Sequence, residues 1–183
     1  MIRIPYLPTI LMISFLWTLV RVCVGLKQKK VDWKRELELL LVYVCIVVLV
    51  RFTFFPFFKV DGKVQPLNLD FAQMFPPRIN PVPLVNMLSY ETFKEMLINV
   101  IGNTAMFIPV GVILPLVYKQ LNTHGKAIAA GVGVSLCIEI LQLPFFERVS
   151  DVNDLLLNSL GYLIGYGIYR LAKRLQKKAA PKA

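Results

Sequence analysis

The sequence predicts an all-α, polytopic membrane helical bundle with about five transmembrane helices, and three observations support this. Hydrophobic residues fill 56% of the 183 positions and charged residues only 17%, against about 45–50% and about 25% in soluble domains. The apolar residues fall in long blocks, each close to the ~20 residues that an α-helix needs to cross the hydrocarbon core. Basic residues gather at the ends of these blocks, which is typical of membrane proteins and argues against a nucleic-acid-binding surface despite the net charge of +10.

The N-terminal part, residues 1–36, is predicted to hold one transmembrane helix and a basic connector. The helix is expected from about Ile4 to Leu26, with prolines tolerated in its first turns. Residues 27–36 then form a short polar connector that is rich in Lys and Arg. This pattern indicates a retained first helix whose C-terminal end stays in the cytoplasm.

The main membrane domain is predicted over residues 37–171, and it begins with a second helix from about residue 37 to residue 55. Residues 56–94 then form a long segment that contains six prolines, so a regular spanning helix is excluded there. The segment is nevertheless apolar. We expect it to lie on the extracytoplasmic side of the membrane, or to dip into it against the bundle, and to cover a site there as a lid.

Three further helices are expected after this segment. The third contains Pro109 and Pro115 as expected kinks, and the fourth is rich in Ala and Gly. A basic cytoplasmic tail follows the fifth. The predicted ranges are residues 95–118, 127–143 and 153–171 for the helices, and residues 172–183 for the tail.

The distribution of Lys and Arg predicts the orientation. The connector 27–36 carries five basic residues, and the stretch from Arg170 to the C-terminus carries six. The turn after the third helix adds Lys119 and Lys126. These three sets can all face the cytoplasm only if the number of spans is odd, so the sequence predicts an N-terminus outside and a C-terminus inside.

Polar residues within the predicted spans are costly and therefore are functional candidates. They follow helical spacing, with pairs one turn apart on the third and fourth helices and a stripe at 3-4-3-4 spacing on the fifth. The predicted orientation brings them to one depth at the outer ends of three helices. We interpret them as a ligand-binding site formed by Asn99, Asn103, Glu139, Gln142, Arg148, Asp151, Asp154 and Asn158.

Structural explanations compete with this interpretation. Asp151 is a good N-cap residue, and the two asparagines of the third helix could simply join helices by hydrogen bonds. The Gly161 and Gly165 spacing favours close helix packing, in which Gly102 would take part. Glu139 is harder to explain in this way, because a buried carboxylate needs a cation, a proton or hydrogen-bond donors.

No established catalytic motif is present in the sequence, so we assign no catalytic residue. The single histidine, His124, lies in a predicted cytoplasmic turn, on the opposite side from the candidate site. Activation of a nucleophile by histidine is therefore not expected at that site. The sequence also predicts no metal site and no cofactor. The lack of a catalytic motif favours a binding protein over an enzyme, and leaves acid chemistry by Glu139 and Asp154 as an open alternative.

A resemblance to a known family emerges from three motifs in order. The chain has Asn99-Val-Ile-Gly102-Asn103 followed by Phe107-Ile-Pro109, then Ser135-x3-Glu139-x2-Gln142, then Arg148-x2-Asp151-x2-Asp154-x3-Asn158-x2-Gly161-x3-Gly165. This order and spacing resembles the VanZ family over about residues 80–169. Residues 1–36 lie outside the resemblance.

The resemblance implies a bacterial plasma-membrane protein and low-level resistance to teicoplanin and related lipoglycopeptides. We therefore expect the outer-leaflet residues to bind a membrane lipid, a cell-wall precursor or a lipoglycopeptide, with Arg148 contacting a phosphate. Two alternatives remain open at this point: a membrane enzyme that modifies an envelope lipid, with Glu139 or Asp154 as acid or base, and a structural partner of other membrane proteins. The sequence leaves the oligomeric state open.

Overall fold

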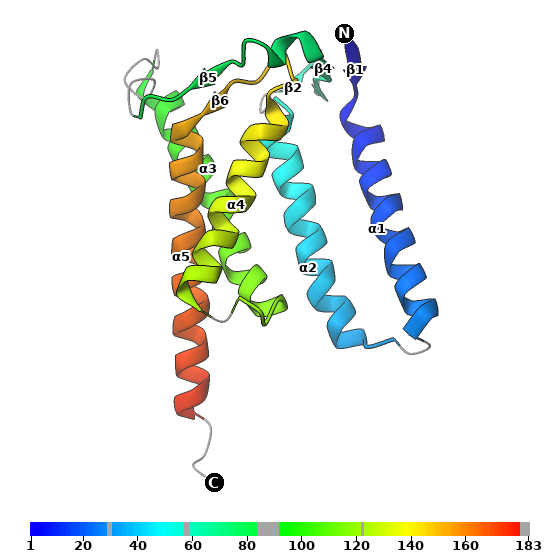
Figure 1. Cartoon of the computed structure of the whole chain (residues 1–183), viewed down its shortest axis with the longest axis vertical. Coiled ribbons are helices and arrows are strands. Elements are labelled where there is room, and N and C mark those ends of the chain that lie inside the picture. The colour runs from blue at the N-terminus through cyan, green and yellow to red at the C-terminus, as the bar shows by residue number, and fades with distance from the viewer. Residues whose placement is uncertain (29–30, 57–58, 84–91, 122, 180–183) are drawn as a thin grey trace. The chain divides into compact units, whose positions relative to one another are not determined.

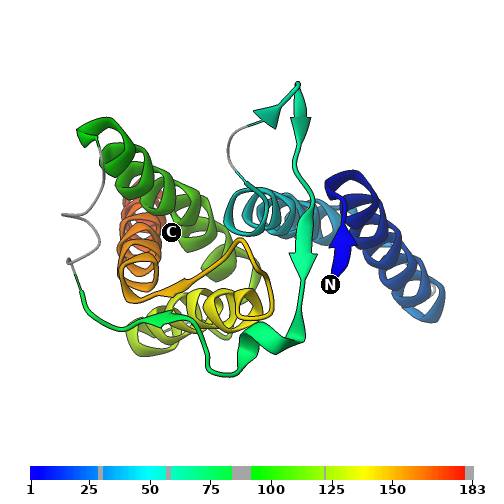
Figure 2. The ribbon, with the colours of Figure 1, turned by 90° about the horizontal axis from the view of Figure 1, so that it is seen from above.

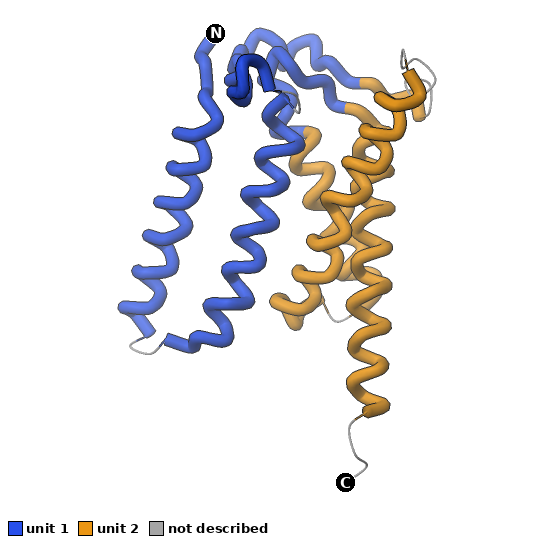
Figure 3. Tube along the Cα trace, turned by 180° about the vertical axis from the view of Figure 1, so that it is seen from behind, with its two compact units in different colours: residues 1–79, 140–150 blue, residues 80–139, 151–183 orange. Residues whose placement is uncertain are grey.

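A computed structural model describes residues 1–28, 31–56, 59–83, 92–121 and 123–179 of the chain (Figure 1). All five predicted helices are present, so the predicted all-α bundle is confirmed. The chain divides into two compact units, drawn in two colours in Figure 3. Unit 1 holds residues 1–79 and 140–150, and unit 2 holds residues 80–139 and 151–183. The helices are α1 (Tyr6–Gln28), α2 (Trp33–Leu49), α3 (Phe93–Val117), α4 (His124–Gln142) and α5 (Val152–Ala179).

Four helical segments in the described part of the chain are long and apolar enough to cross a membrane. They are α1, α2 continued to Phe54, α3 and α4. The fifth helix, α5, is the longest at 28 residues, but its first half carries a polar stripe and its last turns are strongly basic. The predicted direction of insertion stays a prediction, because it depends on the Lys and Arg distribution alone.

Local capping explains where α2 and α3 begin. The side chain of Asp32 accepts hydrogen bonds from the backbone N–H groups of Lys34 at 3.1 Å and Arg35 at 3.2 Å, which satisfies donors that have no partner inside the helix. Thr92 accepts in the same way from the backbone N–H of Glu95 at 3.2 Å. Because Asp32 caps α2, the helix begins at Trp33 rather than at the predicted residue 37.

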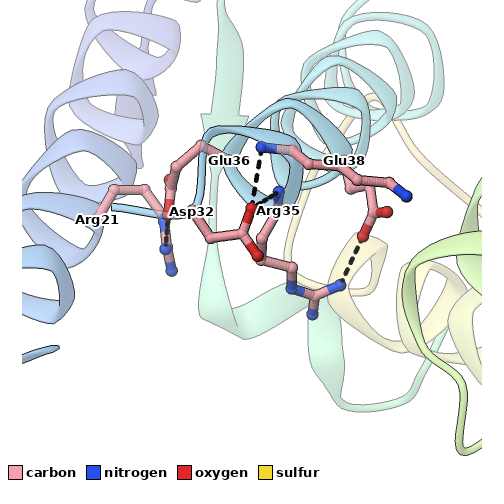
Figure 4. A network of polar contacts seen from close by, with 6 residues as sticks. Arg21, Asp32, Arg35, Glu36 and Glu38 are labelled. Carbon is pink, nitrogen blue, oxygen red and sulfur yellow. Dashed lines mark hydrogen bonds and ion pairs between the residues drawn. The ribbon is translucent and has the colours of Figure 1, made fainter. Parts of the chain in front are cut away.

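Within unit 1, α1 and α2 lie side by side (Figures 1 and 3) and are joined by a few specific contacts. The hydroxyls of Ser14 and Tyr43 are hydrogen-bonded at 2.6 Å, and the ring of Trp17 lies 5.5 Å from that of Tyr43. Near the connector, Arg21 forms an ion pair with Glu36 (Figure 4). No residue of α1 is buried.

The other end of unit 1 contains strand structure that the sequence analysis did not predict. Residues Ile2–Ile4 form β1, which pairs antiparallel with β4 (Leu67–Leu69), so α1 begins at Tyr6 rather than at Ile4. A β-bridge links Leu69 to Phe145 in the turn after α4. The two other short strands of unit 1, β2 (Lys59–Val60) and β3 (Lys63–Val64), form a hairpin.

The segment predicted at 56–94 is irregular, as expected, and includes a short 3-10 helix, η2 (Phe71–Met74). It also contains β5 (Ile79–Asn80), which pairs with β6 (Ser150–Asp151). Residues 57–58 and 84–91 of the predicted lid lie outside the described residues.

Unit 2 is a three-helix cluster of α3, α4 and α5, seen from above in Figure 2. Glycines set the distance between α3 and α5. A Cβ at Gly161 would collide with the carbonyl of Thr104, and one at Gly165 would collide with that of Ile108. Close approach of two backbones at small residues is the usual way in which membrane helices pack. Gly102, expected to share in this packing, has no described atom within 4 Å of an added Cβ.

The predicted end of the fifth helix differs from the observed one for a physical reason. Helix α5 continues to Ala179 instead of ending at residue 171, because the Lys, Arg, Gln, Leu and Ala residues that follow are strong helix formers. Helix α2 ends in a single π-turn, Val50–Phe54. The helix α3 continues through Pro109 and Pro115.

Candidate functional site

Glu139 is the most deeply placed carboxylate of the predicted site. It lies near the C-terminal end of α4 and is only 4% exposed. Its Oε2 accepts a hydrogen bond from the backbone N–H of Asp151 at 2.9 Å. A buried carboxylate is stabilised in its charged form only by such donors or by cations. Glu139 therefore belongs to a built polar network.

Asp151 extends the network from β6 to the start of α5. One carboxylate oxygen accepts from the backbone N–H of Asn153 at 2.8 Å, as an N-cap does. The other accepts from the side-chain amide of Asn80 at 3.0 Å. Asp151 therefore acts as an N-cap of α5 and, through its other oxygen, also belongs to the polar network. Asn80 lies at the start of the stretch that resembles the family, residues 80–169, but it is not among the predicted site residues.

Asp154 and Asn103 join α5 to α3. The Nδ2 amide of Asn103 donates to Oδ1 of Asp154 at 2.5 Å. Asn99 lies one turn earlier on α3 and is half-buried, but within the described residues it makes no hydrogen bond to this network. Of the two asparagines predicted on this helix, the structure therefore brings only Asn103 to the carboxylates.

Asn158 lies one turn further along α5, where it meets α4. It is 2% exposed, and its Nδ2 donates to the hydroxyl of Ser135 at 3.0 Å. Ser135 is fully buried and was missed as a site residue. Its spacing of four residues from Glu139 was the signal, since residues four apart share one face of a helix.

Gln142 and Arg148 belong to unit 1, where both bind the end of α2. Nε2 of Gln142 donates to the carbonyl of Thr53 at 2.5 Å, and Nε of Arg148 donates to the carbonyl of Phe54 at 2.7 Å. The last carbonyls of a helix have no partner inside it, and cationic side chains are favoured there. The predicted site residues are thus divided between the units, and pairing of Arg148 with a carboxylate stays a prediction.

Unit 1 also uses side chains that the sequence analysis did not single out. Nη2 of Arg78 donates to the carbonyl of Phe145 at 2.8 Å, and its guanidinium lies over the Phe146 ring. Asn68 on β4 is hydrogen-bonded to the Glu147 carboxylate through both its backbone N–H and its side-chain amide. These long-range pairs carry no periodic signal in the sequence.

Metal binding finds no support in the described part of the chain, where no group of three or more His, Cys, Asp or Glu side chains is arranged to hold an ion. His124 is exposed and contacts Tyr166, with ring centroids 5.6 Å apart. The hydrogen bonds near Glu139 join carboxylates, amides and backbone N–H groups. Such a set can accept hydrogen bonds from a ligand and orient it.

Apolar helices of spanning length, with a buried network of acids and amides in one unit, define a helical membrane protein that carries a polar interior site. The comparison with protein families then gives its relationship. The family model VanZ/LLP1 matches residues 40–173, which is most of the chain. The chain belongs to this family. The network residues Asn80, Asn103, Glu139 and Asp151 all lie within the matched region, whereas α1 lies outside it.

Two curated proteins are similar to this chain. Protein VanZ of Enterococcus faecium is 33% identical over 82 residues, covering 45% of this chain and 48% of its own length. The uncharacterized membrane protein YwnJ of Bacillus subtilis (strain 168) is 33% identical over 91 residues, covering 50% of this chain and 62% of its own length. The matches thus span about half to three fifths of these relatives. No solved structure matches the chain significantly.

Proposed function

We propose that this VanZ-family membrane protein binds the polar part of an envelope molecule at the network around Glu139. The ligand would be a membrane lipid, a cell-wall precursor or a lipoglycopeptide. The predicted orientation, in which the network lies in the outer leaflet of the plasma membrane, supports this choice. The family relationship supports a link to lipoglycopeptide resistance, which comes to this chain as part of the proposal.

The observation that carries the proposal is the concentration of three carboxylates in one small region of unit 2. Glu139, Asp151 and Asp154 are each held by a backbone or amide donor. Holding them together costs electrostatic repulsion and desolvation that a purely structural hydrogen bond between helices does not require. A ligand with N–H, O–H or ammonium groups would offset this cost. Amino sugars, peptide amides and amino head groups all offer such donors.

Binding is a better match to this network than catalysis is. The described carboxylates are fixed by hydrogen bonds, and the single histidine lies at the other end of α4. A binding site needs groups that are held in place before the ligand arrives, because less ordering is then required on binding. The Glu139–Asp151 and Asn103–Asp154 pairs provide that order.

The test is protection of a susceptible bacterium against teicoplanin, combined with direct binding to purified protein in lipid nanodiscs. Glu139→Gln keeps the shape of the side chain but removes its charge. A hydrogen bond to a charged group contributes about 1.5–3 kcal/mol, so affinity should fall by roughly ten- to a hundredfold at about 1.4 kcal/mol for each factor of ten. Protection should be lost in parallel.

Glu38→Gln is the matched control, because Glu38 pairs with Arg35 near the start of α2 in unit 1 (Figure 4). It should leave protection and binding unchanged at equal amounts of protein in the membrane. Full protection by Glu139→Gln would contradict the proposal. A lipid species that appears or disappears when the protein is expressed would indicate an enzyme instead.

A further inference from the structure

The interface between α4 and α5 in unit 2 carries a polar or small residue at every turn. On α5 these are Asp154, Asn158, Tyr162 and Tyr166, spaced four residues apart. On α4 the matching positions, from the same end, are Glu139, Ser135, Gly131 and finally His124. Helical positions four apart share a face, so each set forms one stripe along its helix.

Contacts show that the two stripes face each other at three places. Asn158 donates to Ser135, and a Cβ at Gly131 would collide with the ring of Tyr162. One turn further, the ring of Tyr166 meets that of His124 edge to face. Glycine is therefore required at 131 to admit the phenol ring between the helices. The result is one file of polar groups inside the unit, here called the α4–α5 polar file.

Several polar atoms along the file are buried without a hydrogen-bond partner among the described residues. They are Oδ1 of Asn158 and the hydroxyl of Tyr162, both on α5, and the hydroxyl of Thr104 on α3. Asn158 and Tyr162 are only 2% and 1% exposed. Buried polar groups are almost always satisfied, and where the protein supplies no partner an ordered water usually does.

We propose that the α4–α5 polar file is a hydrated proton path between Glu139 and His124. From Glu139 to Ser135, and from Asn158 to Tyr162, the step is four residues, about 6 Å along the helix axis, which is close to the separation that a single bridging water spans with two hydrogen bonds of about 2.8 Å each. From Gly131 to His124 the step is seven residues of α4, about 10.5 Å, so this end of the file needs more than one water. The hydroxyls of Ser135 and Tyr162 both donate and accept, so they pass protons. Asn158 holds the water between them.

The transfer is a relay that leaves every group as it began. A proton that binds the Glu139 carboxylate is followed by one proton shift at each water and hydroxyl, and the imidazole of His124 releases one proton to the solution. One proton crosses the file and nothing is oxidised or reduced. The path covers about 22.5 Å, from the 15 residues of α4 between Glu139 and His124 at 1.5 Å each, and chains of ionisable and hydroxyl groups in membrane helices commonly serve this purpose.

The groups around the two ends suit entry and exit of protons. Glu139 faces Asp151 from β6 and shares its end of the bundle with Asp154 on α5, which keeps negative charge where protons would be taken up. His124 is exposed and faces Tyr166, which stacks on Tyr169, with Lys173 close to that second ring. This inference does not depend on the proposed ligand.

Proton flux into vesicles provides the test. The full-length protein is reconstituted into liposomes that contain a pH-sensitive dye, and a potassium gradient with valinomycin drives protons inward. Wild-type vesicles should acidify faster than protein-free vesicles. Tyr162→Phe keeps the ring against Gly131 and removes the hydroxyl. It should slow the proton flux at least about tenfold. This is less than the roughly hundredfold or greater rate contribution of a positioned proton-transfer side chain in catalysis.

His124→Ala separates transport from stability, because His124 is exposed and its loss should leave the bundle folded. Its flux should fall, and imidazole added to the buffer on the His124 side should restore it. Tyr43→Phe in α2 is the matched control and should behave like wild type. Equal flux in wild-type and protein-free vesicles would overturn the proposal. So would a Tyr162→Phe protein that conducts normally, or a His124→Ala defect that imidazole does not repair.

Discussion

Unit 1 and unit 2 join their helices by different means. In unit 1, α1 meets α2 through side chains near the surface: a hydroxyl pair, an aromatic contact and the Arg21–Glu36 ion pair. In unit 2, α3 and α5 touch backbone to backbone at glycines, and polar side chains are buried between helices. Buried contacts tolerate less change, because neither lipid nor water can replace them. Substitutions should therefore have larger effects in unit 2.

The largest effect is expected at the α3–α5 contact. Gly161→Leu places a side chain where the carbonyl of Thr104 now lies, so the two backbones must separate. We expect a loss of at least about 3 kcal/mol, the upper range for overpacking a core, measured as a large drop in the thermal unfolding temperature in detergent. Gly102→Leu, which has open space around it, is the control and should unfold near the wild-type temperature.

An intermediate effect is expected where Arg148 binds a carbonyl at the C-terminal end of α2. Arg148→Ala leaves the carbonyl of Phe54 without the donor that now lies 2.7 Å away. Loss of a charge-assisted hydrogen bond should cost about 1.5–3 kcal/mol and should speed amide exchange in residues 50–56. Arg148→Lys should recover only part of the stability, since an ammonium lacks the planar donors of a guanidinium. Unchanged amide exchange in the alanine variant would show that the Arg148–Phe54 hydrogen bond does not stabilise residues 50–56.

The smallest effect is expected at the Arg21–Glu36 pair, whose side chains are 23% and 29% exposed. Such partly exposed ion pairs contribute little to stability, because water and salt screen them. A double-mutant cycle with Arg21→Gln and Glu36→Gln should give a small coupling that shrinks as salt is added. A coupling as large as the stability lost in Gly161→Leu would contradict the expectation that substitutions have larger effects in unit 2 than in unit 1.

The helices of both units could be predicted from apolar runs, because the length of such a run is a local property. The strand at Ile2–Ile4 could not, since three residues are too few to show an alternating pattern and its partner lies more than 60 positions away at Leu67–Leu69. The π-turn at the end of α2 leaves no periodic signal either. The extension of α5 to Ala179 was missed because charged residues were taken as the end of the helix as well as of the span.

The polar network shows the same division between local and long-range information. The spacing on α5 places Asp154 and Asn158 on one face, and the structure joins them to Asn103 and Ser135. Gln142 has the same kind of spacing relative to Glu139, yet it binds the carbonyl of Thr53. Which side chain satisfies a helix end depends on where another helix stops, and sequence spacing alone does not contain that information.

The absence of buried residues in α1 has a consequence for how this helix sits in a bilayer. Its 23 residues make a rod about 35 Å long, which exceeds a hydrocarbon layer of about 30 Å. A helix fixed by tight packing along its length could not respond to this mismatch, but α1 buries no residue and is held at its N-terminal end by the β1–β4 pairing, so it can tilt about that end. Its tilt should therefore follow membrane thickness, and lipids with longer acyl chains should bring it closer to upright.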